Sequence, residues 1–294
     1  MNTKPPKRRR SNVADANQPS TVPATAAKPP SQFDAYRVFL ILLFLAISLG
    51  GVYLVTKSRD AVSGSPRFTY EKVAEHNHDE TAFTQGLVYD NDWIWESTGL
   101  LGQSKLRKWK LETGDIVKEI SLDEDLFGEG LTIANDKLYQ LTYKAGKCFV
   151  YDREFNLLAT HEYEGQGWGL TFDKQNSLIM SNGSSRLVFR DPETFEQQRV
   201  ITVREGRRSI PEINELEYSG GKIIANRLNS DYLYEINPED GQVTGVIDLT
   251  GLWPVRERPQ QGVLNGIAID PEKEKILVTG KLCPKIYEIK IKAQ

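Results

Sequence analysis

The sequence predicts an all-β protein, a five-bladed β-propeller preceded by a disordered tail and one transmembrane helix. Two observations support this prediction. A short motif recurs five times along the chain, and each copy begins a series of short strands separated by turn signals. We expect the tail at residues 1–37, the membrane segment at residues 38–56, a linker at residues 57–66 and the propeller at residues 67–294.

The repeated motif places a polar or aromatic residue among glycines and apolar side chains. Its five copies read FTQGL, FGEGL, GWGL, NELE and VLNGIA, and the residues at the equivalent place are Gln85, Glu129, Trp168, Asn214 and Asn265. Glycine allows two backbones to approach closely. Equivalent positions of a repeat are expected to converge, so the five side chains should meet at one site with Glu129 at its centre.

The strands that follow each motif predict the blades. Every copy continues with a second apolar strand and a third strand that contains an aromatic residue, and the first four copies have a fourth strand. The motifs lie about 40 to 50 residues apart, the length of a four-stranded blade. The last copy ends at Gln294 without its fourth strand. Residues 67–73, which precede the first motif, are expected to supply it and to close the ring.

The N-terminal part differs in composition. The tail has many Pro, Ala, Ser and Thr residues, few large apolar ones, and seven basic residues against two acidic ones, so it is predicted to be disordered. Val38–Thr56 contains no charge and is close to the length needed to cross a bilayer. The basic cluster on its N-terminal side predicts a retained signal anchor, with the tail in the cytoplasm and the propeller periplasmic, extracellular or lumenal.

Charge excludes one class of partner. From Val38 onward the chain has 30 basic and 38 acidic residues, a balance that argues against nucleic acid as a ligand. The two cysteines, Cys148 and Cys283, belong to different repeats and are expected to be unpaired. We expect a monomer.

The motifs, together with Thr279-Gly280-Lys281, resemble the plant and bacterial type of glutaminyl-peptide cyclotransferase, a family of five-bladed propellers. The resemblance extends from about residue 70 to residue 289 and preserves the motif order. It implies an enzyme that cyclises an N-terminal glutamine of a peptide to pyroglutamate and releases ammonia, without a required cofactor or metal. A structural Ca²⁺ ion in the propeller channel is compatible with this function.

The resemblance also implies the site residues. Glu129 falls on the catalytic position, where a carboxyl group could carry the proton from the amine to the leaving nitrogen. The residues expected to bind substrate are Phe83, Gln85, Phe127, Tyr143, Trp168, Asn214 and Lys281. Amides and an ammonium suit the side-chain amide and its oxyanion, and aromatic rings would exclude water.

Three departures leave a second hypothesis open. Tyr143, Leu228 and Cys283 stand where the family usually has tryptophan. Tyr143 keeps a flat wall, but Leu228 does not, and it predicts a wider or weaker pocket. The alternative is a catalytically weakened, membrane-anchored propeller that binds peptides or an envelope partner.

Other polar clusters have structural interpretations. Residues 76–80, which read HNHDE, are expected to form a solvated loop rather than a metal site. Asp90-Asn91-Asp92 is predicted to be a hairpin turn. Glu215 and Glu217 share one strand face, where a structural ion or a ring of hydrogen bonds is favoured over acid and base roles.

Overall fold

The computed structural model describes residues 64–270 and 272–294. The chain divides into two compact units, Met1–Ala61 and Val62–Gln294, and every described residue belongs to the second. The predicted tail and membrane segment therefore lie outside the described residues. Within the part of the chain that is described, no helix combines the length and apolar character needed to cross a membrane.

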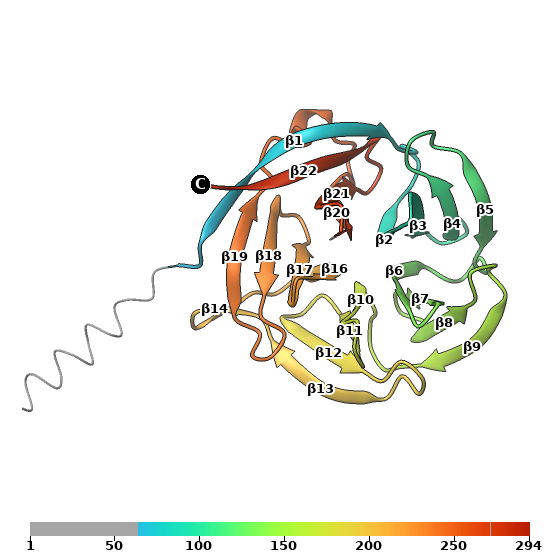
Figure 1. Ribbon diagram of the computed structural model, residues 1–294. Coiled ribbons are helices and arrows are strands. Elements are labelled where there is room, and N and C mark those ends of the chain that lie inside the picture. The colour runs from blue at the N-terminus through green and yellow to red at the C-terminus, as the bar shows by residue number, and fades with distance from the viewer. Residues whose placement is uncertain (1–63, 271) are drawn as a thin grey trace, which may run out of the picture. The chain divides into compact units, whose positions relative to one another are not determined.

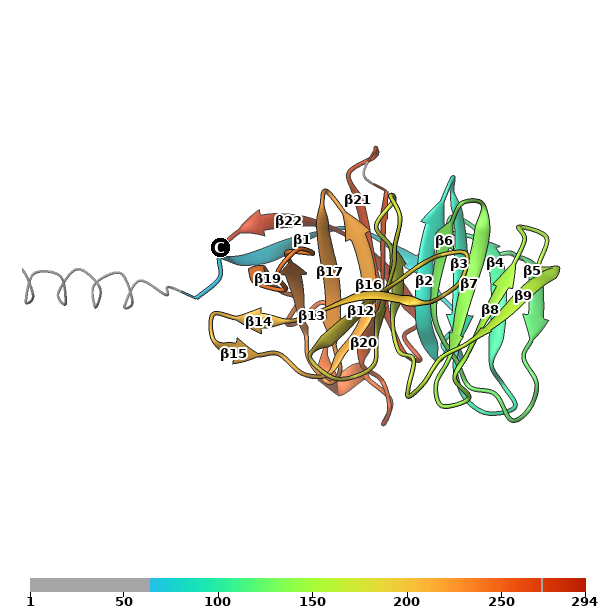
Figure 2. The same ribbon diagram turned by 90° about the horizontal axis from the view of Figure 1, so that it is seen from below.

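The second unit is built from antiparallel sheets that surround a common axis, as in a β-propeller (Figure 1). Turned by 90°, the same sheets stand side by side with their strands running along that axis (Figure 2). The strands nearest the axis are β2 (Thr84–Asp90), β6 (Gly128–Ala134), β10 (Leu170–Phe172), β16 (Ile213–Ser219) and β20 (Leu264–Asp270). The second strands are β3 (Trp93–Thr98), β7 (Lys137–Thr142), β11 (Leu178–Ser181), β17 (Lys222–Arg227) and β21 (Lys275–Gly280).

The outer positions are filled in the same order. The third strands are β4 (Lys105–Lys110), β8 (Lys147–Tyr151), β12 (Arg186–Arg190), β18 (Tyr232–Ile236) and β22 (Lys285–Ala293). The fourth are β5 (Ile116–Ser121), β9 (Leu157–Glu162), β13 (Gln197–Thr202), β19 (Val243–Asp248) and β1 (Arg67–Asn77). A short hairpin of β14 (Arg204–Glu205) and β15 (Arg208–Ser209) and a 3₁₀ turn, η1 (Val255–Glu257), lie in loops, and the sequence did not predict them.

The prediction that an N-terminal strand completes the last group is confirmed. β1 pairs antiparallel with β22 from Phe68↔Ala293 to Asn77↔Lys285, so it runs four residues beyond the predicted end at Val73. It also pairs in parallel with β19 at Arg67↔Val246, which joins two four-stranded groups into one eight-stranded sheet. Both edges that this strand meets are thereby covered.

The first described residues already belong to this assembly. Ser65 Oγ donates a hydrogen bond to the Val243 carbonyl at 2.8 Å, and the Val246 amide donates to the Pro66 carbonyl at 2.9 Å. Residues 64–66, predicted as the end of the linker, are therefore held against β19.

The core lies between adjacent sheets. One cluster contains Trp95 and Leu106 from the first sheet with Leu131 and Leu138 from the second, all at most 1% exposed. Strands at the outer positions are more exposed, as in β9, where all residues but His161 are exposed. This gradient explains why the inner strands read as apolar runs whereas the outer strands are mixed.

Candidate active site

All eight predicted site residues line one cavity of about 170 Å³. Its wall consists of Phe83, Gln85, Phe127, Glu129, Tyr143, Trp168, Asn214, Leu228 and Lys281. Leu228, which the sequence marked only as a departure, is the ninth lining residue. Cys283 is not among them: it is buried in an apolar cluster with Trp253, so the third departure leaves this wall unchanged.

Close backbone packing explains the glycines of the motifs. A Cβ atom added to Gly86 would lie less than 3.0 Å from the backbone of Leu131. A Cβ on Gly130 would meet Trp168 and Leu170, and one on Gly169 would meet Asn214, equally closely. Successive inner strands therefore approach so tightly that their side chains must converge on the axis, and the prediction made from the motifs is confirmed.

Four inner strands carry a β-bulge at the motif, a feature that the sequence did not reveal. The register shifts fall between Thr84 and Gly86 in β2, Gly128 and Leu131 in β6, Ile213 and Leu216 in β16, and Leu264 and Ile267 in β20. Each shift contains the polar motif residue. A bulge bends its strand and re-aims a side chain, so it turns these groups out of the ordinary alternation of the strand.

Glu129 lies at the bottom of the cavity and is only 4% exposed. Gln85 Nε2 donates a hydrogen bond to Glu129 Oε1 at 3.1 Å. Lys281 lies near enough for its charge to act on the carboxyl group, and its Nζ is 4.9 Å from the centre of the Phe83 ring. The carboxyl group thus has an amide donor and a cation within an otherwise apolar wall.

Burial raises the pKa of Glu129 well above its ordinary value, while the positive charge of Lys281 opposes the rise. Burial lowers the pKa of Lys281 in turn, and the negative charge of Glu129 opposes that change. Each group therefore holds its proton within reach of neutral pH more readily than it would in water. Such a carboxyl group can both accept and return a proton.

Aromatic rings form a continuous wall beside this pair. Phe127 lies edge-on to Phe83 at 6.1 Å and packs on Tyr143 at 5.7 Å, and Tyr143 lies 6.4 Å from Trp168. Trp168 Nε1 donates a hydrogen bond to Gln166 Oε1 at 3.0 Å, which fixes the indole. The sequence analysis missed Gln166, although its position two residues before Trp168 is the only signal it offered.

Asn214 supplies a polar group on the opposite side. It is 2% exposed, and its Oδ1 has no hydrogen-bond partner among the described residues. Leu228 follows β17 and is held by its amide, which donates to the Glu212 carbonyl at 2.9 Å. An unpaired buried acceptor at the wall of a cavity is suited to a ligand N–H group.

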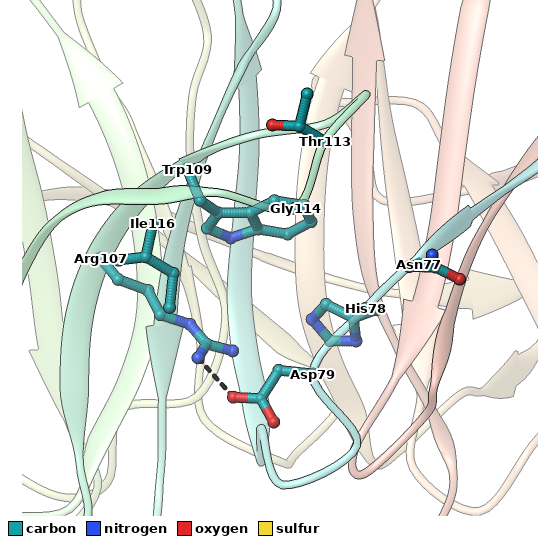
Figure 3. Close-up of a pocket in the computed structure, with 8 residues that line it drawn as sticks. All are labelled: Asn77, His78, Asp79, Arg107, Trp109, Thr113, Gly114 and Ile116. Atoms are coloured by element: carbon teal, nitrogen blue, oxygen red, sulfur yellow. Dashed lines mark hydrogen bonds and ion pairs between the residues drawn. The ribbon is translucent and has the colours of Figure 1, made fainter.

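A larger cavity, about 280 Å³, lies elsewhere and shares no lining residue with the cavity around Glu129 (Figure 3). Asp79 and Arg107 face each other in it, joined by a hydrogen bond of 2.7 Å, and the Trp109 indole stacks on His78 with ring centres 5.7 Å apart. Arg107 Nε also bonds Glu96 Oε2 at 2.9 Å. These charges satisfy one another, so the cluster has the character of a structural anchor.

This cluster corrects one prediction. Residues 76 and 77 end strand β1, and the His78 side chain is 1% exposed, so the expected solvated loop is wrong at these positions. The His78 ring contacts the Cys283 carbonyl at 2.7 Å and Glu96 Oε1 at 3.1 Å. Closure by β1 carries the segment into the interior, an effect of long-range pairing. Among the described residues, no group of three or more histidine, cysteine or acidic side chains converges as a metal site.

The two acidic residues of β16 are buried separately from the Glu129 cavity. Glu215 Oε2 accepts a hydrogen bond from the Ile267 amide at 2.9 Å. Burial raises the pKa of Glu217 to about 8, although the charge of Lys174 opposes this. Asn91 and Asp92 have positive φ and connect β2 to β3, which confirms the predicted hairpin turn. Cys148 and Cys283 are free and buried, as expected.

Comparison with known proteins agrees with this geometry. The family model described as glutamine cyclotransferase matches residues 43–291. A glutaminyl-peptide cyclotransferase of Arabidopsis thaliana is 37% identical over 285 residues, covering 92% of this chain and 88% of the relative. The crystal structure of Myxococcus xanthus glutaminyl cyclase matches with a TM-score of 0.73 and 35% identity, over 78% of this chain and 99% of that one. The sequence relative, the similar structure and the family model all point the same way, and the chain belongs to the glutamine cyclotransferase family.

Proposed function

We propose that this protein converts the N-terminal glutamine of peptides to pyroglutamate with release of ammonia. One observation carries the proposal: a single buried carboxyl group, Glu129, shares a small cavity with an amide donor and a lysine. The volume of about 170 Å³ suits one amino-acid side chain and its amine rather than an extended peptide. The names of the relatives fit the same chemistry.

The reaction is an acyl transfer within one residue, which makes the enzyme an aminoacyltransferase. The α-nitrogen of the substrate forms a bond to the carbon of its own γ-carboxamide, and the bond from that carbon to the amide nitrogen breaks. Glu129 takes the proton from the attacking amine and returns it to the leaving nitrogen, so that neutral ammonia departs. No nucleophile of the protein is required, and positioning supplies a large part of the rate.

The remaining wall residues have matching roles. The Asn214 Oδ1 atom has no partner among the described residues and can accept a hydrogen bond from the substrate. Lys281 supplies positive charge for the oxyanion that forms at the γ-carbon. The rings of Phe83, Phe127 and Trp168 exclude water, so a proton moves between Glu129 and substrate instead of into solvent.

Ammonia release from a glutamine-initiated dipeptide tests the proposal. Two matched peptides serve as controls: one with a blocked α-amine, which has no nucleophile, and one that begins with asparagine, whose ring would be too small. We expect release only from the free glutamine peptide and no loss on addition of a chelator. Tight binding of that peptide without ammonia release would favour the alternative of a weakened, peptide-binding propeller.

Two finer features extend this proposal. The eight-stranded sheet consists of the groups β16–β19 and β20–β22 with β1, so with the three four-stranded sheets the unit counts as five blades. Residues 38–56 anchor the chain in a membrane, which their uncharged apolar run supports. The basic residues before them favour a cytoplasmic tail and a catalytic domain on the other side.

Protease protection tests the topology. Protease added to intact cells with a permeabilised outer layer should cleave the catalytic domain and leave the tail around Lys7 intact. Protection of the catalytic domain in this assay would reverse the proposed orientation.

A further inference from the structure

The hydrogen bonds beneath Glu129 form a chain that ends at a backbone carbonyl. Gln85 Nε2 donates to Glu129 Oε1 at 3.1 Å, and Gln85 Oε1 accepts from Asn265 Nδ2 at 3.4 Å. Asn265 Nδ2 also donates to the carbonyl of Thr84 at 3.0 Å. Gln85 and Asn265 are 2% and 1% exposed, so water does not compete for these groups.

The polarity of this chain is set at its far end. A backbone carbonyl can only accept a hydrogen bond, so Asn265 must turn its NH₂ group toward Thr84. The same NH₂ group faces Gln85, which must then present its oxygen to Asn265 and its own NH₂ group to Glu129. Reversing any carboxamide would place two oxygens against each other in a buried site.

Asn265 is itself held firmly. It lies in the bulge of β20, where the next two amides are bound by buried side chains: Gly266 N–H donates to Asn226 Oδ1 at 3.1 Å and Ile267 N–H to Glu215 Oε2 at 2.9 Å. Gly266 has a φ of 122°, and a Cβ there would approach Thr279 within 3.0 Å. The backbone that carries Asn265 therefore cannot adjust easily if its side chain changes.

We propose that Asn265 is a positioning residue for the cyclisation, because it determines which end of the Gln85 carboxamide faces Glu129. This inference rests on the proposed function. With the NH₂ group toward it, Glu129 is stabilised as a carboxylate and can take up the amine proton. With the oxygen toward it, Glu129 would keep its own proton to make a hydrogen bond and could not act as the base.

The decisive substitution is Asn265→Asp in the full chain, since it keeps the shape but removes both donors. The Gln85 amide should then turn to donate to the new carboxylate, and its oxygen should face Glu129. We expect kcat to fall at least about tenfold with little change in KM. The acid limb of kcat/KM should move upward by about one pH unit, because the carboxylate form of Glu129 has lost a hydrogen bond.

Two further variants separate orientation from simple loss of structure. Asn265→Leu frees the Gln85 amide without reversing it, so its shift of the acid limb should have the same sign and be smaller. Asn226→Asp introduces an equally buried carboxyl group but keeps the oxygen that binds Gly266, and it should retain the wild-type pH profile. The titratable groups that interact with Glu129, Lys281 and Tyr163, are unchanged in every variant.

A double-mutant cycle provides the specific readout. In a Gln85→Ala background, Asn265→Asp should not shift the acid limb further, because Asn265 acts through Gln85. An equal shift in both backgrounds would overturn the inference, as would a wild-type profile for Asn265→Asp. If the Asn265→Asp chain does not fold, an unchanged acid limb in Asn265→Leu overturns it. A wild-type protein that releases no ammonia from glutamine peptides would instead refute the proposed function.

Discussion

Two fully buried glutamates of this protein have opposite electrostatic properties. Burial alone would raise the pKa of Glu96, but the charges of Arg107 and His78 and the hydrogen bond from Thr84 outweigh it and hold the pKa far below its ordinary value. Burial raises the pKa of Glu129, and only Lys281 opposes it. Both residues lie on or beside the first two inner strands, so the difference comes from partners rather than depth.

The comparison shows how one fold makes a structural and a reactive carboxyl group. Glu96 accepts hydrogen bonds from Thr84, Arg107 and Trp109 and contacts His78, which leaves no capacity for substrate. Glu129 receives one bond, from Gln85, and its other oxygen faces a cavity. A buried carboxyl group with unfilled hydrogen-bonding capacity is the one that can exchange a proton with a ligand.

The largest expected effect is on stability at the structural site. Arg107→Met leaves Glu96 and Asp79 without their main cation, and removal of one partner of a buried ion pair costs about 3–5 kcal/mol. Urea denaturation should show this decrease in the free energy of unfolding. Lys118→Met is the control, because Lys118 pairs with an exposed Glu154 and should cost less than about 1 kcal/mol. Equal losses in the two variants would refute the structural role.

The next effect is on turnover at the reactive site. Glu129→Gln keeps the shape and a hydrogen bond but cannot carry a proton, so kcat should fall at least about 10²-fold while KM changes little. Steady-state ammonia release measures both quantities. Glu217→Gln, a buried glutamate outside the cavity, should retain most of the turnover. Near-full activity of Glu129→Gln would mean that positioning and oxyanion binding suffice.

The pH dependence of stability separates the two kinds of carboxyl group by sign. Glu96 has a lowered pKa in the folded state, so its contribution is present above its ordinary value and is lost as the pH falls below it. Glu217 has a raised pKa of about 8, so the folded protein keeps a proton that the unfolded chain releases. Stability should therefore decline as the pH rises from about 4.5 to about 8.

Glu217→Gln tests the second half of this statement. The variant cannot lose a proton, so its free energy of unfolding should decline less between pH 5 and pH 8 than that of the wild type, by roughly 1–3 kcal/mol. Denaturation at a series of pH values measures the slope. An identical slope in the two proteins would show that Glu217 is not buried as an acid.

The smallest expected effect concerns the cavity wall. Leu228→Trp would add a flat ring to the lining opposite the aromatic wall, and aromatic packing contributes about 0.5–1.5 kcal/mol. KM for a glutamine dipeptide should fall roughly two- to tenfold with kcat nearly unchanged. A matched Tyr143→Phe variant keeps its ring and should leave KM close to that of the wild type. A higher KM in Leu228→Trp would indicate that the ring blocks the cavity.

The sequence by itself determined the strands, their order and the identity of the cavity residues. Period-2 patterns and turn residues are local, and a motif repeated at nearly equal spacing places equivalent side chains at equivalent points of a symmetric assembly. Gln85, Glu129, Trp168 and Asn214 therefore could be assigned to one site before any coordinates were known. The missing fourth strand of the last repeat similarly identified β1 as its partner.

Only the tertiary structure decided how these groups are used. The bulges at Gln85, Glu129, Asn214 and Asn265 depend on register between strands, which sequence periodicity does not encode. His78 looked like part of a polar loop because its partners, Glu96 and the Cys283 carbonyl, are 18 and 205 residues away. A pKa depends on burial and on which charges converge, so the same residue type became an anchor at Glu96 and a candidate proton carrier at Glu129.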